Sequence, residues 1–135
     1  MNTNANSPGM DTKVMLSTLW LFVLLNMIFR DIHEFIKAEF IQEILTGIVN
    51  GTQITEGLLL IGAIMIEIPI AMVLLSRVLK YSVNRWANII ISSFNIALII
   101  INRPGDYDDI FFAAIEIAAL LLIIRYAWKW SEQEA

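Results

Sequence analysis

Four apolar segments dominate this chain, and each is about as long as a lipid bilayer is thick. They run approximately over residues 14–36, 54–79, 83–101 and 110–130. A helix needs about 20 apolar residues to cross the hydrocarbon core of a bilayer. Since these segments use most of the 135 residues, the sequence predicts an all-α fold, a four-helix transmembrane bundle with no room for a soluble domain.

The remaining residues predict one membrane domain, at 13–131, with short ends. Residues 1–12 are polar and lack the basic start of a signal peptide, so we expect a disordered lead there, and a short tail at 132–135. Between the first two spans, the apolar residues of 38–49 fall on one helical face. That stretch is too short to span, so it predicts a short amphipathic interfacial helix, ended by the Asn-Gly pair at 50–51.

Composition excludes several classes of function. The chain has no cysteine, which excludes disulfides, thiolate catalysis and cysteine-based metal sites. Its one histidine excludes a multi-histidine metal site within one chain, and we expect no metal and no cofactor. A net charge of −4 without a basic cluster argues against nucleic acid as a partner.

The basic residues predict an orientation in the membrane. With four spans, both termini and the loop between the second and third spans share one side, which holds six bases, whereas the other side holds three. The six are Lys13, Arg77, Lys80, Arg85, Arg125 and Lys129, and the three are Arg30, Lys37 and Arg103. Cytoplasmic loops carry an excess of Lys and Arg. We therefore expect a multi-pass protein, in contact with the lipid bilayer, with both termini in the cytoplasm.

Polar side chains inside the spans are the candidates for function. Asn26, Glu67, Asn95 and Glu116 fall near the middle of their segments and are expected to meet in one layer. An ionised carboxylate at that depth needs a partner, and no Lys or Arg lies at the same level on these helices. The two glutamates are then expected to be protonated, to share a proton, to bond to the asparagines or to bind a cation. The alternative is that the layer only bonds neighbouring helices together.

Other polar positions are weaker candidates. The third span carries a stripe of asparagines on one face, including Asn88, for which interhelical bonding is the favoured reading. His33 lies at an interface, where a histidine without a role is more common than a proton shuttle. Arg85 most simply anchors the span at the membrane surface. The secondary candidates are Asp31, His33, Glu56, Asn84 and Arg85.

These residues support three hypotheses of function. The first is a protein that binds or transports a small molecule in an acid- and amide-lined cavity, with linkage to protons or cations. Its candidate site residues are Glu67, Glu116, Asn26, Asn88 and Asn95. Because four spans make a narrow bundle, a transporter of this kind is expected to form a homodimer. The alternatives are an intramembrane enzyme acting on a lipid-like substrate and a structural or accessory subunit, and the sequence leaves open whether the chain is an enzyme.

Three stretches resemble a family of small four-span bacterial membrane proteins, a domain of unknown function: STLWLFVLLNMIFRDI, EIPIAMVLLSRVLKYSVNRWANII and FFAAIEIAALLLIIRYAWKW. The most specific parts are the EIP motif at 67–69 and the NRWAN motif at 84–88. The resemblance extends over residues 16–130. The positions that it makes part of the family pattern are Asp31, Glu67, Pro69, Asn84, Arg85, Asn88 and Glu116.

This resemblance implies a four-helix bundle in a prokaryotic inner membrane, and it implies no activity. Arg30 departs from the family pattern, in which an uncharged residue is more typical at that position. The departure argues against a role for residues 30–34.

Overall fold

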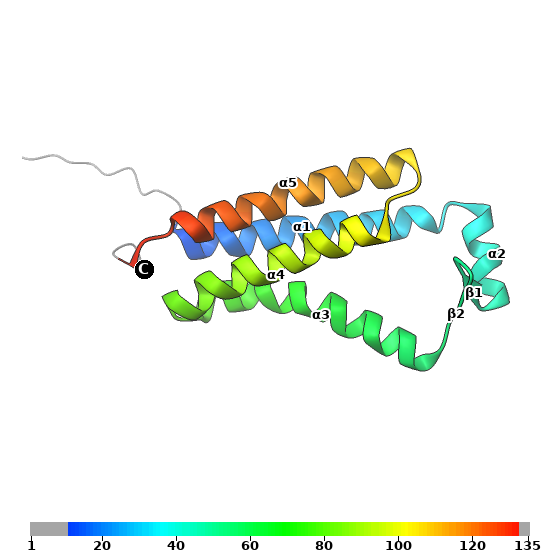
Figure 1. Cartoon of the computed structure of the whole chain (residues 1–135), viewed down its shortest axis with the longest axis horizontal. Helices are drawn as coiled ribbons and strands as arrows, with labels where there is room; N and C mark the ends of the chain where they lie inside the picture. The colour runs from blue at the N-terminus through cyan, green and yellow to red at the C-terminus, as the bar shows by residue number, and fades with distance from the viewer. Residues whose placement is uncertain (1–10, 133–135) are drawn as a thin grey trace, which may run out of the picture.

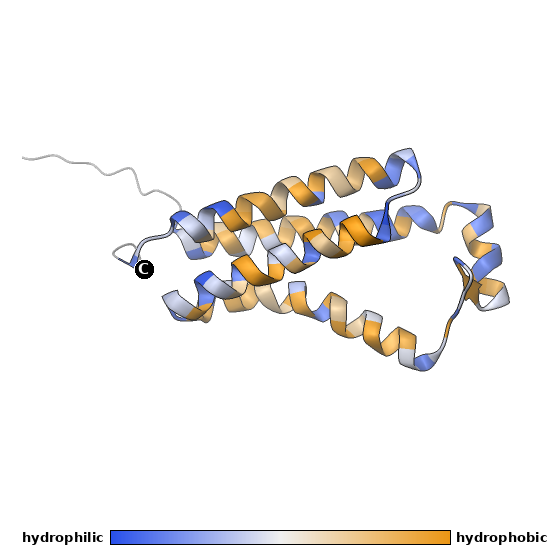
Figure 2. Cartoon of the chain, viewed as in Figure 1, coloured by the Kyte–Doolittle hydropathy of each residue, from blue (hydrophilic) through white to orange (hydrophobic). Residues whose placement is uncertain are grey.

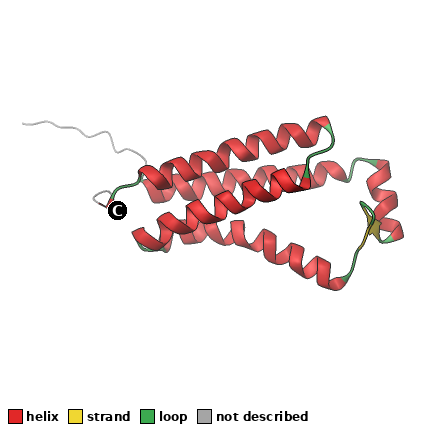
Figure 3. Ribbon diagram, in the orientation of Figure 1, coloured by secondary structure: helices red, strands yellow, loops and turns green. Residues whose placement is uncertain are grey.

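The computed structural model describes residues 11–132 and confirms an all-α fold with four long helices (Figures 1 and 3). In chain order the elements are α1 (Thr12–Glu34), α2 (Ala38–Thr46), β1 (Ile48–Val49), β2 (Thr52–Gln53), α3 (Glu56–Val78), α4 (Tyr81–Asn102) and α5 (Tyr107–Lys129). The four long helices, α1, α3, α4 and α5, are each long enough and apolar enough to cross a membrane. The expected lead at 1–12 lies mostly outside the described residues, but Asp11 and Thr12 already belong to the start of α1.

Side chains cap the helices that follow polar segments. Asp11 accepts a hydrogen bond from the backbone N–H of Lys13 at 3.0 Å, and Thr55 accepts one from Leu58 at 3.2 Å. Such bonds satisfy N–H groups that the first helical turn leaves without partners. The caps define the starts of α1 and α3, which lie within two residues of the predicted spans.

A short helix is present between α1 and α3, as predicted, but its predicted end at residues 50–51 is wrong. α2 ends at Thr46, because Gly47 adopts the left-handed conformation with φ of 74°. Asn50 and Gly51 instead form the turn of a hairpin between β1 and β2, and both have positive φ, 48° and 72°. An Asn-Gly pair is a strong signal for this two-residue turn.

The long helices pack in a definite order. α1 lies between α3 and α5, and α5 packs in turn against α4, whereas α3 has much less contact with α4 (Figure 1). We call the end of the bundle where α1 begins and α5 ends the termini end, and the opposite end the loop end. The buried apolar core lies mainly toward the termini end and consists of Leu16, Trp20, Val23, Met72, Ala119, Leu120, Ile123, Ala127 and Trp130.

Apolar side chains also cover most of the outer surface of the long helices, while hydrophilic residues gather on α2 and at the two ends of the bundle (Figure 2). That distribution suits helices surrounded by lipid, which are apolar on the outside as well as the inside.

α3 divides into two halves at Pro69. Every residue from Glu56 to Glu67 is exposed, and Pro69 is the first buried residue of the helix. Proline lacks the N–H that would bond to the carbonyl of Met65, and such a missing bond is a common cause of a bend. Before Pro69 the helix leans away from the bundle toward α2, and after it the helix packs on α1 (Figure 1).

Candidate functional site

An ion pair joins α1 to α5 in the loop-end half of the bundle. Nη1 of Arg30 donates to Oε2 of Glu116 at 3.0 Å. The side chain of Glu116 is 1% exposed and that of Arg30 is 25% exposed. The other oxygen of Glu116, Oε1, is buried and has no hydrogen-bond partner among the described residues. A buried carboxylate with one free oxygen is costly unless something else donates to it.

The ion pair lies in the wall of a cavity of about 820 Å³, which we call the loop-end cavity. Pockets that bind small molecules usually measure about 300–1,000 Å³. Its wall comes from α1, α4, α5 and the loop between α4 and α5, together with Phe40 of α2 and Asn50 of the hairpin. The polar side chains of the wall are Arg30, Asp31, Glu34, Asn50, Asn95, Asn102, Arg103, Asp106, Asp109 and Glu116.

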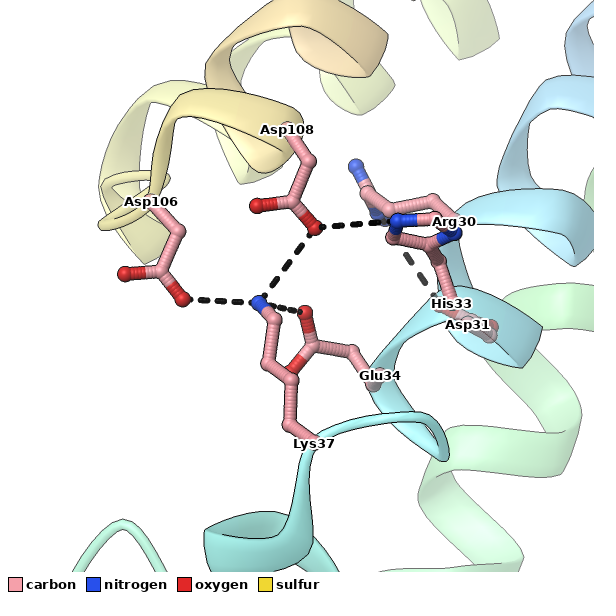
Figure 4. A network of polar contacts seen from close by, with 7 residues as sticks. All are labelled: Arg30, Asp31, His33, Glu34, Lys37, Asp106 and Asp108. Carbon is pink, nitrogen blue, oxygen red and sulfur yellow. Dashed lines mark hydrogen bonds and ion pairs between the residues drawn. The ribbon is translucent and has the colours of Figure 1, made fainter.

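A second set of charges closes the loop end around Lys37 (Figure 4). Its Nζ lies 2.6 Å from Oε1 of Glu34, 2.7 Å from Oδ2 of Asp106 and 3.4 Å from Oδ2 of Asp108. The hydrogen bonds to Asp106 and then to Glu34 raise the pKa of Lys37 above its usual value. The cluster ties the segment after α1 to the start of α5.

His33 lies beside this cluster, and Asp109 forms a group of three acids with two of its members, Glu34 and Asp108. Nε2 of His33 is 3.9 Å from Oδ2 of Asp108, a contact too long for a hydrogen bond. Glu34, Asp108 and Asp109 bring carboxylate oxygens within 4.8 Å of one another. Lys37 already supplies a positive charge to Glu34 and Asp108. The Lys37 ammonium therefore already balances part of the negative charge of these three acids.

A separate polar network lies toward the termini end and is fully buried. Oδ1 of Asn88 accepts from Nε1 of Trp20 at 2.7 Å and from Oγ of Ser76 at 3.2 Å. Nδ2 of Asn88 donates to Oδ1 of Asn84 at 2.7 Å, and Nδ2 of Asn84 donates to the carbonyl of Ser76 at 2.7 Å. These bonds connect α1, α3 and α4 and pair the side-chain amides with one another, so the network is built to hold helices together.

Arg85 reinforces the same end of the bundle from α4. Its Nη2 donates to the carbonyl of Trp128 at 3.2 Å, and its guanidinium lies 5.7 Å from the centre of the Trp128 ring. Tyr81, one turn earlier, donates to the carbonyl of Trp130 at 2.8 Å. Arg85 therefore fastens α4 to the end of α5.

The four residues of the predicted polar layer do not meet in one place in the structure. Glu116 and Asn95 line the loop-end cavity together, but Glu67 is exposed on the leaning half of α3 and lines neither this cavity nor the groove described below. Asn26 bonds to its own helix, through the carbonyl of Phe22 at 2.9 Å. The expectation that two unpaired glutamates face one another is wrong, because α3 leans outward and Arg30 pairs with Glu116.

The other candidates also separate. Asn88 and Asn84 belong to the termini-end network, whereas Asp31 lines the loop-end cavity and lies 3.9 Å from Nε of Arg30. Glu56 is exposed at the start of α3.

Sequence reasoning missed the partners of the buried polar residues. The resemblance argues against a role for Arg30, which departs from the family pattern. In the structure Arg30, near the end of α1, pairs with Glu116 of α5, and Lys37, in the segment after α1, pairs with Asp106, just before α5. Trp20 and Ser76 each have one side-chain polar group in a mostly apolar stretch. A single polar group of this kind does not indicate which residue it bonds to.

Comparison with known proteins gives a match to a family model. A model whose description reads "family of unknown function" matches residues 9–135, nearly the whole chain. No curated protein and no solved structure matches the chain.

Proposed function

Because the chain belongs to DUF6326, a family of unknown function, we propose its function from the arrangement of its side chains. It is a membrane protein that binds a small cationic molecule, such as an amine, in the loop-end cavity. The observation that carries this proposal is the free oxygen of Glu116, which is buried and faces no donor among residues 11–132. An ammonium group in the cavity would donate the missing hydrogen bond.

The charge of the cavity wall favours a cation. The wall contains five carboxylates but only two arginines, and one of these, Arg30, is already paired with Glu116. Lys37, outside the wall, bonds to Glu34 and Asp106 and offsets part of the excess. A cleft lined mainly by one sign of charge attracts ions of the other sign.

Asn95 adds a neutral acceptor to the same wall. Its Nδ2 donates to the carbonyl of Ile91 at 2.9 Å, which turns the amide nitrogen toward its own helix. The bond to Ile91 is the one side-chain hydrogen bond that Asn95 forms among the described residues, and it leaves the amide oxygen available. Asn95 and Glu116 therefore supply two oxygens to a donor in the cavity.

Transport of the bound cation across the membrane would be a further step beyond binding. The buried core around Trp20, Leu120 and Ile123 fills the bundle toward the termini end, so a bound molecule reaches the loop end more readily than the termini end. Transport would require that core to open, which a homodimer could assist. The excess of bases on one side supports cytoplasmic termini, and the resemblance described above implies a bacterial inner membrane.

A structural role is the second candidate, and the ion pair itself favours it. Arg30 and Glu116 join α1 to α5, and the termini-end network joins three helices without needing a ligand. A purely structural bundle would show the same bonds but would bind nothing in the cavity.

Ligand-induced stabilisation of the purified protein in detergent separates the two candidates. We would compare putrescine, a small diamine, with succinate, a dianion of similar length. A ligand present at 100 times its Kd stabilises the folded state by about 2.7 kcal/mol. We expect putrescine to raise the unfolding temperature with increasing concentration and succinate to leave it unchanged.

Two glutamine variants complete this test. Glu116→Gln should abolish the putrescine effect because it removes the buried negative charge. Glu67→Gln is the matched control, since it removes the same charge from an exposed position outside the cavity, and it should retain the effect. A wild-type protein that responds equally to the diamine and the dianion, or to neither, contradicts the proposal.

A further inference from the structure

A groove between α1 and α3 lies on the outside of the bundle, away from the loop-end cavity. It has a volume of about 490 Å³ and extends from Ile70 and Leu24 toward the termini end. Apolar side chains line most of it, and the polar residues of its wall, Ser17, Thr18 and Arg77, gather at the end nearest the membrane surface. The groove therefore has an apolar length and one basic end.

Hydrogen bonds hold the basic end in place. Nε of Arg77 donates to Oγ of Ser17 at 3.0 Å, and Oγ of Ser17 in turn donates to the carbonyl of Val73 at 2.6 Å. Ser17 is 2% exposed, so the guanidinium is attached to a buried group on the neighbouring helix. The two terminal nitrogens of Arg77 have no protein partner between residues 11 and 132.

No acid compensates this arginine. The groove wall contains no carboxylate, and within the described part of the chain no carboxylate lies within ion-pair distance of Arg77. The positive charge of the guanidinium is therefore not balanced by an acid of the described residues, and its four terminal N–H groups can donate to a ligand at the exposed end of the groove. Two adjacent guanidinium nitrogens match the oxygens of a phosphate group.

We propose that this groove binds a phospholipid with an anionic headgroup. One acyl chain lies in the apolar part beside Leu21, Val73 and Leu74, and the phosphate accepts hydrogen bonds from the terminal nitrogens of Arg77. Arg77 lies in the last turn of α3. In a helix that spans the bilayer, this turn is expected to lie at the depth of the lipid phosphates. This site shares no residue with the loop-end cavity and does not depend on the proposed function.

Native mass spectrometry of the detergent-purified protein tests the proposal. The probes are phosphatidylglycerol and phosphatidylcholine with the same acyl chains. We expect the wild-type protein to bind phosphatidylglycerol more tightly than phosphatidylcholine. Arg77→Gln should weaken phosphatidylglycerol binding at least about tenfold, since hydrogen bonds to a charged group are lost.

Arg125→Gln is the matched control, because it removes an exposed arginine from the same end of the bundle outside the groove. It should bind phosphatidylglycerol like the wild type. Leu74→Trp tests the acyl chain separately, since a larger side chain fills the groove while Arg77 remains. Equal losses from Arg77→Gln and Arg125→Gln, or unchanged binding by Leu74→Trp, overturn the proposal.

Discussion

Arg30 and Glu116 form an ion pair whose two members differ in exposure. Glu116 is almost completely buried, whereas a quarter of the Arg30 side chain is exposed. Removing one member of a buried pair leaves the other charge without compensation and costs about 3–5 kcal/mol. Replacing both members with apolar residues is often nearly neutral, because both desolvation costs disappear together.

We therefore expect Arg30→Met to lower the free energy of unfolding by about 3 kcal/mol. The double variant Arg30→Met with Glu116→Leu should recover most of this loss. Reversible unfolding of the protein in mixed micelles measures both values. Additive losses in the double variant would contradict an interaction between the two side chains.

Single residues also show where sequence reasoning reaches its limit. Of the asparagine stripe on α4, Asn84, Asn88 and Asn95 are buried, whereas Asn102 at the end of the helix is exposed. The partners of Asn84 and Asn88 on α1 and α3 depend on how those two helices are rotated about their axes, and a uniformly apolar sequence does not indicate that rotation. The residues around Glu67 resemble those around Glu116, so the local sequence does not distinguish them. Helix packing leaves Glu67 exposed on the outside of the bundle and buries Glu116 inside it.

Among the elements, α2 has the clearest division between two faces. Phe40, Ile41, Ile44 and Leu45 fall on one side of the helix, and Glu39, Gln42, Glu43 and Thr46 fall on the other. None of its residues is buried in the bundle, and Leu45 is 81% exposed. A helix of nine residues with this pattern suits the surface of a membrane.

A nitroxide label tests this position of α2. The chain has no cysteine, so Leu45→Cys and Glu39→Cys each give one labelled site. In liposomes we expect the label at Leu45 to be more accessible to oxygen, which dissolves in lipid, than to a water-soluble nickel complex. The label at Glu39 should show the opposite preference. Equal preferences at the two sites would mean that α2 does not lie at the interface.

At the scale of the whole molecule, the number and approximate bounds of the long helices could be predicted because apolar length is recorded directly in the sequence. The packing order could not, because helices that are apolar on all sides give no periodic signal for which neighbour they face. The lean of α3 follows from Pro69, which the sequence shows, but its direction depends on contacts with α1.

Reporter fusions test the proposed orientation in a bacterial host. Alkaline phosphatase is active only outside the cytoplasm, so a fusion after Ala135 should be inactive, while a fluorescent protein at the same point should be bright. A phosphatase fusion made after Gly105, between α4 and α5, should be active because it follows three spans. The reversed pattern would place both termini outside and contradict the assignment from the basic residues.

The lean of α3 also gives the protein a tapered outline. Its first half departs from the other helices, so the cross-section at the loop end is broader than at the termini end (Figure 1). A tapered body takes up more area in one leaflet than in the other. Lipids around this protein therefore have to pack differently on the two sides of the bilayer.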